Sequence, residues 1–291
     1  MARKPRLNKI IALLEEGKPA FGTIAYNGDL DGMTYVANAG YDFIFIENEH
    51  VGLDFTNLRI SLQFLLNRKK LGRPGSLQAE PTPLVRVPTN AEEIASNQWV
   101  IKQTLDHGVY GIVLPKLETV EAARSAIAGC RYFKSAGVSD TEPVGERGWS
   151  PARAAQYWGL PVLEYFEAAD LWPLDPDGEL LLMAICESAE GVKNLPDILE
   201  QTRGIGMVLA GPGDLAVSMG KAGNIWDPDV QDALQKTLEA CKRFDVACAT
   251  VAATAEEVDQ RLEQGFRAFI TPYRRENPAL DRGLYLRRSG G

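Results

Sequence analysis

The sequence predicts a (β/α)8 barrel, and three observations predict it. Eight short apolar runs recur along the 291 residues, and amphipathic segments separate most of them. The runs are rich in β-branched, aromatic and leucine residues, which is typical of strands buried on both faces of a parallel sheet. Eight strand–helix repeats in succession favour a closed barrel over an open, doubly wound sheet.

The predicted strands cover residues 21–26, 43–47, 84–87, 111–115, 180–186, 207–210, 246–251 and 268–271. Several of the helices between them have start signals, namely Asp54, the pair Asn90 and Glu93, Asp227 before Pro228, and the pair Thr254 and Glu257. Such residues accept hydrogen bonds from the free N–H groups of a first helical turn. A further helix at about 8–16 is expected to close the floor of the barrel.

The stretch 131–178 interrupts this alternation. It contains no clear strand and is rich in glycine, proline and aromatic residues. We therefore expect one domain over 1–291 with a long loop insertion at about 131–178. An insertion of this length in a barrel is usually a lid or an oligomer contact.

The charge balance bears on the partners of the protein. There are 31 Lys and Arg residues against 39 Asp and Glu, which gives a net charge of −8 and disfavours nucleic acid and anionic membranes as partners. The four cysteines lack the C-x-x-C spacing, so reduced, buried thiols in a cytoplasmic protein are expected. No secretory signal is visible, and no apolar run reaches about 18 residues, the length that would cross a membrane.

Polar residues follow several of the predicted strands. Glu47 and His50 stand at the end of the second strand, Arg86 in the third, Glu187 after the fifth and Asp214 shortly after the sixth. Barrel enzymes carry their working residues at the carboxyl ends of the strands. We therefore expect these side chains to meet at one face of the barrel.

Glu187 and Asp214 are candidate metal ligands, because they come from neighbouring strands. Two carboxylates with room for water and substrate suit Mg²⁺ or Mn²⁺, and Co²⁺ is also compatible with oxygen ligands. Zinc is disfavoured, since His50 and His107 are the only histidines. The alternative is structural: Asp214 caps a helix and Glu187 is a solvated strand end.

Three further features have both a catalytic and a structural interpretation. His50 and Glu47 could form a proton-transfer pair, or His50 could be a packed strand end. Arg86 could stabilise an enolate oxygen, and a salt bridge to Glu47 or Glu49 would be compatible with that role. The turn formed by Gly211, Pro212, Gly213 and Asp214 could receive a carboxylate or phosphate on its N–H groups.

Together these residues resemble the class II, metal-dependent pyruvate aldolases. This is the group of 4-hydroxy-2-oxoheptane-1,7-dioate aldolase, the 2-dehydro-3-deoxy sugar-acid aldolases and macrophomate synthase. The resemblance extends from about residue 22 to 268, and it is strongest in the segments 40–50, 84–88, 105–115, Glu187 with 192–195, and 211–215.

The resemblance implies a reaction and a cofactor. The reaction would be reversible cleavage of a 4-hydroxy-2-oxo acid to pyruvate and an aldehyde, with oxaloacetate decarboxylation as a side activity. A divalent metal on Glu187 and Asp214 would hold pyruvate as its enolate. Arg86 would stabilise the enolate, and His50 with Glu47 would move protons. The turn from Gly211 to Asp214 would hold the substrate carboxylate.

The resemblance also implies an assembly. A helix at about 277–288 would be exchanged between subunits, in a homohexamer built as a trimer of dimers. The chain departs from the family at two site positions. It has Glu47 where the family commonly has aspartate, and Ile185 where relatives often have glutamine. The substrate site around Ile185 is therefore expected to be more apolar. The alternatives are a lyase similar to citrate lyase or acting on malyl thioesters, a dedicated decarboxylase, or a barrel that binds a small acid without turnover.

Overall fold

The computed structural model describes residues 5–67, 77–133 and 143–289, in which eight parallel strands form a closed barrel. Its strands are β1 (Ala20–Tyr26), β2 (Phe43–Glu47), β3 (Thr82–Arg86), β4 (Gly111–Leu114), β6 (Leu180–Cys186), β7 (Met207–Ala210), β8 (Ala247–Val251) and β9 (Ala268–Ile270). They follow one another around the barrel in chain order, and the pairing of β9 with β1 closes it. The predicted fold is confirmed, with each predicted strand within two residues of its observed ends.

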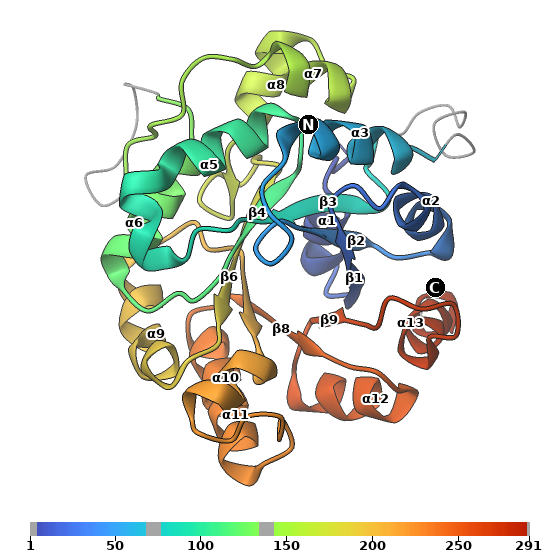
Figure 1. Ribbon diagram of the computed structural model, residues 1–291, viewed down its shortest axis with the longest axis vertical. Coiled ribbons are helices and arrows are strands. Elements are labelled where there is room, and N and C mark those ends of the chain that lie inside the picture. The colour runs from blue at the N-terminus through green and yellow to red at the C-terminus, as the bar shows by residue number, and fades with distance from the viewer. Residues whose placement is uncertain (1–4, 68–76, 134–142, 290–291) are drawn as a thin grey trace.

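Helices form a ring around these strands (Figure 1). They are α2 (Leu30–Ala39), α3 (Phe55–Phe64), α5 (Ile94–Asp106), α6 (Val120–Cys130), α9 (Ala189–Gln201), α10 (Pro212–Ser218), α11 (Pro228–Arg243), α12 (Ala255–Gln264) and α13 (Pro278–Ser289). The predicted opening helix is α1 (Lys9–Glu15), whose residues Ile10 and Leu14 are buried in one cluster with the side chains that fill the barrel. The predicted barrel floor is therefore confirmed.

Most of the predicted helix starts are confirmed. The side chains of Asp54, Asp227 and Thr254 each accept a hydrogen bond from a backbone N–H of the first helical turn. The prediction for Asn90 is wrong, because its side chain makes no capping hydrogen bond. A short 3₁₀ helix, η1 (Ala91–Glu93), intervenes, so the first N–H groups of α5 lie a full turn beyond Asn90.

The stretch 131–178 contains more regular structure than the sequence indicates. It includes α7 (Ala152–Trp158), α8 (Val162–Ala168) and the two-residue strand β5 (Leu171–Trp172), which pairs with β6. A strand this short has no detectable alternation, which is why the pattern missed it. The two helices lie together at the end of the molecule opposite α11 (Figure 1).

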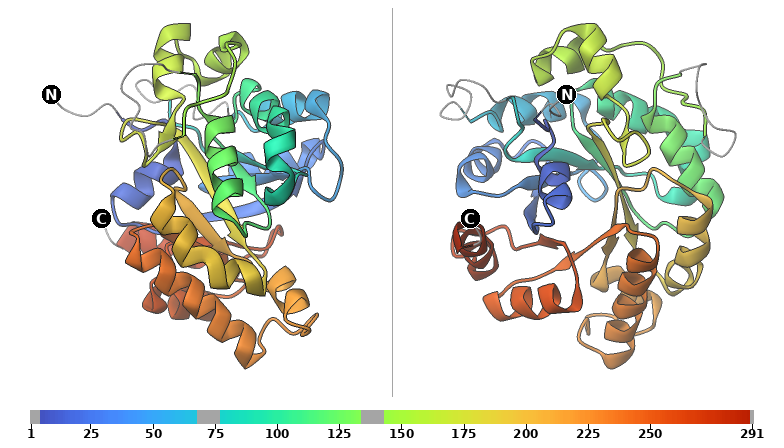
Figure 2. Two further views of the ribbon diagram at one scale, coloured as in Figure 1. Left: turned by 90° about the vertical axis from the view of Figure 1, so that its left-hand side faces the viewer. Right: turned by 180° about the vertical axis from the view of Figure 1, so that it is seen from behind.

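The C-terminal helix α13 packs in this chain against α12 and β1 of its own barrel, and Figure 2 shows it beside α12 from behind. Its exchange between subunits stays a prediction. None of the helices among the described residues is long and apolar enough to cross a membrane. The four cysteines are free and buried, as predicted.

Candidate active site

Glu47 and Arg86 lie side by side at the carboxyl ends of β2 and β3, where the strand register pairs them. The Arg86 guanidinium donates to Glu47 Oε2 from Nε at 2.6 Å, and its Nη2 lies 2.5 Å from the same oxygen. Glu47 is 1% exposed, so its negative charge compensates a guanidinium held at the barrel mouth. The salt bridge between Arg86 and Glu47, which the sequence analysis considered as one alternative, is therefore present.

His50 is placed differently from the predicted pairing. Glu47 Oε1 accepts the backbone N–H groups of Glu49 and His50, at 2.6 and 3.0 Å. Both oxygens of Glu47 are therefore engaged by Arg86 and by the turn. The His50 ring instead has its Nε2 3.5 Å from Glu49 Oε2, and its side chain is 65% exposed. The role of His50 in proton transfer stays a prediction, with Glu49 in place of Glu47 as the neighbour of the ring.

Glu49 is a site residue that the sequence interpretation considered only as a salt-bridge partner. Its Oε2 lies 3.2 Å from Arg86 Nε. Burial raises the pKa of Glu49, and the charges of Glu47 and Asp214 add to this, while Arg86 and His50 oppose it. The signal that could have found it is the spacing of two from Glu47, because alternate residues of an extended chain point to the same side.

Glu187 follows β6 and is 9% exposed. Its Oε1 accepts the backbone N–H of Lys116 at 2.7 Å, so the loop after β4 fixes the orientation of the carboxylate. Burial raises the pKa of Glu187 to about 7, and the negative charges of Asp214 and Glu49 contribute to the rise. Asp214 thus adds to the negative charge at Glu187, and their joint role as metal ligands stays a prediction.

The glycine-rich turn connects β7 to α10 beside Glu187. Gly211 donates its N–H to the carbonyl of Cys186 at 3.1 Å. A Cβ at Gly211 would lie 3.0 Å from Ile185 Cγ2 and 3.2 Å from Glu187 Cβ, so glycine permits this close approach. Pro212 and Gly213 are the first two residues of α10, and the exposed Asp214 is the third. Ile185 is buried among the side chains that fill the barrel.

The donor set fits a divalent cation. Glu187 is a buried carboxylate whose pKa is raised to about 7 by burial and by the negative neighbours Asp214 and Glu49, and a cation would relieve that accumulation of charge. Among the described residues there is no cluster of three or more His, Cys, Asp or Glu in a metal-binding arrangement. A cation on Glu187 and Asp214 would therefore complete its coordination with oxygens of substrate and water.

Comparison with known protein families agrees with this site. Residues 31–271 match the model of the family described as HpcH/HpaI aldolase/citrate lyase, whose members are generally dependent on divalent metals. Over 227 residues the chain is 33% identical to the 5-keto-4-deoxy-D-glucarate aldolase of Salmonella arizonae, covering 78% of this chain and 75% of that protein. The counterpart in Salmonella paratyphi C is 32% identical over the same length.

Solved structures share the fold. An HpcH/HpaI aldolase/citrate lyase family protein from Burkholderia cenocepacia superposes with a TM-score of 0.72 at 26% identity, over 97% of this chain and 96% of that one. An HpcH/HpaI aldolase from Desulfitobacterium hafniense gives a TM-score of 0.71 at 22% identity, over 99% and 96%.

Proposed function

Because the chain belongs to the HpcH/HpaI aldolase/citrate lyase family, we propose that it cleaves a 4-hydroxy-2-oxo acid reversibly to pyruvate and an aldehyde. The chain is an enzyme of the aldolase and lyase type, as its relatives are. The observation that supports the proposed substrate class is the position of Arg86, Glu187 and the turn that carries Asp214 at the carboxyl ends of β3, β6 and β7. A 2-oxo acid has the two adjacent oxygens that such a site recognises.

The residues present suit the steps of this reaction. Glu187 and Asp214 would hold a divalent cation, which when bound supplies the Lewis acidity that makes the methyl protons of pyruvate easier to remove. Arg86 is oriented by its ion pair with Glu47, and we assign to it the stabilisation of the negative oxygen in the enolate and in the new alkoxide.

The backbone N–H groups at the start of α10 are candidates to hold the substrate carboxylate, and the side chain of Ile185 lies close to Gly211 of this turn. For proton transfer we assign His50, with Glu49 as the neighbouring carboxylate. The ring is exposed and can exchange protons with solvent.

A pyruvate enolate also forms when oxaloacetate loses carbon dioxide. We therefore expect oxaloacetate decarboxylation as a side activity at the same site. It needs no aldehyde, so it reports on the 2-oxo acid half of the site without the second substrate.

The first experiment is exchange of the pyruvate methyl protons in D2O, followed by NMR with Mg²⁺ or Mn²⁺ and then with EDTA. The expected result is exchange that disappears with EDTA and in Glu187→Gln. Exchange that persists in EDTA would point to lysine Schiff-base chemistry and would contradict the assignment. No exchange with any of Mg²⁺, Mn²⁺ or Co²⁺ would remove pyruvate as the donor.

The assembly is a separate proposal. We expect a homohexamer, a trimer of dimers in which α13 is exchanged. Light scattering on the purified protein gives the mass directly, and a monomer of 31.9 kDa would contradict it.

A further inference from the structure

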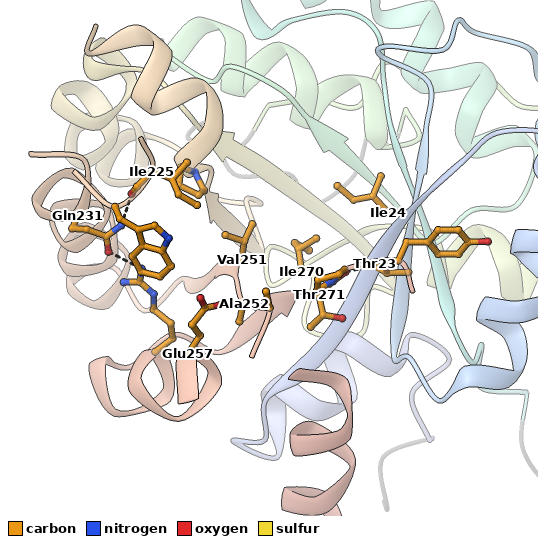
Figure 3. A pocket seen from close by; sticks show the side chains of 15 residues that line it. Thr23, Ile24, Ile225, Gln231, Val251, Ala252, Glu257, Ile270 and Thr271 are labelled. Atoms are coloured by element: carbon orange, nitrogen blue, oxygen red, sulfur yellow. Dashed lines mark hydrogen bonds between the residues drawn. The ribbon is translucent and has the colours of Figure 1, made fainter. Parts of the chain in front are cut away.

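A cavity of about 420 Å³ opens at the barrel mouth over β8, β9 and β1 (Figure 3). Its strand residues are Val251 from β8, Ile270 from β9, and Thr23 and Ile24 from β1. Pro212, the first residue of α10, also lines it and joins it to the turn that carries Asp214. The cavity therefore borders the turn of the proposed reaction site.

The mouth is divided into two chemically distinct halves. The ends of β2, β3, β6 and the β7–α10 turn carry the charged groups of the proposed site. The ends of β8, β9 and β1 carry aliphatic side chains, and Trp226, Ile225 and Pro272 from the loops complete an apolar wall. A substrate bound by its 2-oxo acid group in the charged half would extend its remaining part into the apolar half.

The polar side chains on the strand side of the cavity are already hydrogen-bonded within the protein. Thr23 Oγ1 donates to the carbonyl of Thr271 at 2.9 Å, and Thr271 Oγ1 donates to the carbonyl of Gly22 at 3.2 Å. The Tyr273 hydroxyl donates to Asp29 Oδ2 at 3.3 Å. These groups have their partners before any ligand enters.

The same holds for the helical side, where Figure 3 shows the bonds of Gln231. Gln231 donates from Nε2 to the carbonyl of Ile225 and accepts from Arg261 Nη2, each at 2.6 Å. Arg261 Nη1 donates to Gln264 at 3.1 Å, and Glu257 Oε2 accepts the Ala253 N–H at 2.6 Å. A hydroxylated chain would lose its bonds to water in this cavity and find few replacements, which is unfavourable.

Apolar surface, by contrast, is available to a ligand. Val251 is 38% exposed and Trp226 is 52% exposed, although both line a cavity. An apolar ligand group would cover them and gain roughly 25 cal/mol for each Å² removed from water. The cavity is also large enough for a ring, since small-molecule sites begin at about 300 Å³.

We propose that the aldehyde partner of this enzyme carries a bulky apolar substituent, alkyl or aryl, and that Val251 is a specificity-determining residue for it. This inference rests on the proposed function and names its second substrate. It separates the chain from its relatives, which are named for a hydroxylated sugar acid, 5-keto-4-deoxy-D-glucarate. In the addition direction the pyruvate methyl carbon loses a proton and bonds to the aldehyde carbon, and the aldehyde oxygen gains a proton.

The experiment compares two aldehydes with pyruvate and Mn²⁺, 3-phenylpropanal and glyceraldehyde, through kcat/KM for pyruvate consumption. We expect a preference of about tenfold or more for 3-phenylpropanal. The variant Val251→Thr keeps the β-branched shape but adds a hydroxyl. It is expected to lower kcat/KM for 3-phenylpropanal about fivefold and to leave the value for glyceraldehyde nearly unchanged.

The matched control is Val162→Thr on α8, because Val162 is 37% exposed and lies outside the cavity. This variant should leave kcat/KM unchanged for both aldehydes. A preference for glyceraldehyde, or equal behaviour of the two variants, overturns the inference. Exchange of the pyruvate methyl protons in D2O distinguishes failure of this inference from failure of the proposed function. If the enzyme catalyses exchange but accepts neither aldehyde, only this inference is contradicted. If it does not catalyse exchange, the proposed function is contradicted as well.

Discussion

Lys116 has an unusual backbone conformation beside the candidate metal site. Its φ is 52°, in the left-handed region that residues with a side chain rarely adopt. The same residue donates its N–H to Glu187 Oε1. Strain of this kind persists where the surroundings determine it and often marks a functional site. We infer that the conformation aims the N–H that orients Glu187.

Substitutions at Lys116 should distinguish the effect of its backbone conformation on Mn²⁺ affinity from the effect of its side chain. Lys116→Gly removes the strain and should bind Mn²⁺ close to wild type, because glycine adopts positive φ freely. Lys116→Val disfavours this conformation and should weaken Mn²⁺ affinity by about tenfold, roughly 1.4 kcal/mol. Isothermal titration with Mn²⁺ measures both. Asp245→Val is the control, since Asp245 has a φ of 54° in the turn before β8. Equal Mn²⁺ affinity in all three variants would contradict this role of the backbone.

Single residues also show what the sequence could predict. Glu47, Arg86 and Glu187 were placed at the mouth from their positions at strand ends, and the structure has them there. The partner of His50 was not predictable, because it depends on which oxygens of Glu47 the turn already uses. The choice among neighbouring hydrogen-bond partners leaves no periodic pattern in the sequence, so it could not be predicted.

Among the elements, the β7–α10 turn depends on Gly211 for a steric reason. Its φ is −87°, which any residue tolerates, so alanine would not strain the backbone. Gly211→Ala would instead press a methyl group on Ile185 and Glu187. We expect oxaloacetate decarboxylation to fall by about tenfold or more, since displacements near 1 Å at a reacting centre have such effects. Gly148→Ala is the control, because nothing lies within 4 Å of its added Cβ. Equal rates in the two variants would show that the turn tolerates the methyl group.

The helix α13 is attached to the barrel through Asp42, which is fully buried. Asp42 Oδ2 accepts from Arg287 Nη2 at 2.6 Å and from the Phe21 N–H at 2.9 Å, and Lys9 Nζ lies 3.2 Å from Oδ1. Burial raises the pKa of Asp42 although these cations oppose the rise. Since the pKa is higher in the folded chain, the ionised carboxylate costs folding free energy as pH rises above the unfolded value of about 3.9.

Arg287→Met should therefore destabilise the protein in a pH-dependent way. Without Arg287 the pKa of Asp42 rises further, so the loss is small near pH 4 and increases toward neutral pH. We expect the free energy of unfolding to fall by about 3 kcal/mol at pH 8, which is the order of magnitude found when one partner of a buried ion pair is removed. Urea unfolding at the two pH values measures it, and the exposed Arg288→Met is the control. A loss independent of pH would mean that packing of the arginine side chain, and not its charge, is what matters.

For the whole molecule, periodicity and strand ends predicted the barrel because each strand is buried on both faces and reads as apolar. The segment 131–178 was read as a loop because α7 and α8 are seven residues each and β5 is two. Elements that short have little periodicity. The apolar cavity was also beyond prediction, because β1, β8, β9 and a loop before α11 meet there from distant parts of the chain.

Metal binding should couple the site to the stability of the whole chain. A ligand that binds only the folded state at 100 times its Kd adds about 2.7 kcal/mol, which for a chain of this size raises Tm by about 4 °C. We expect saturating Mn²⁺ to shift Tm by this amount and EDTA to reverse it, measured by scanning calorimetry. Glu187→Gln should lose the shift yet melt no lower than wild type in EDTA, because the amide can still accept the Lys116 N–H and no longer repels Asp214 and Glu49. The exposed Glu190→Gln should keep the shift. A Mn²⁺ shift that survives in Glu187→Gln would place the cation elsewhere in the molecule.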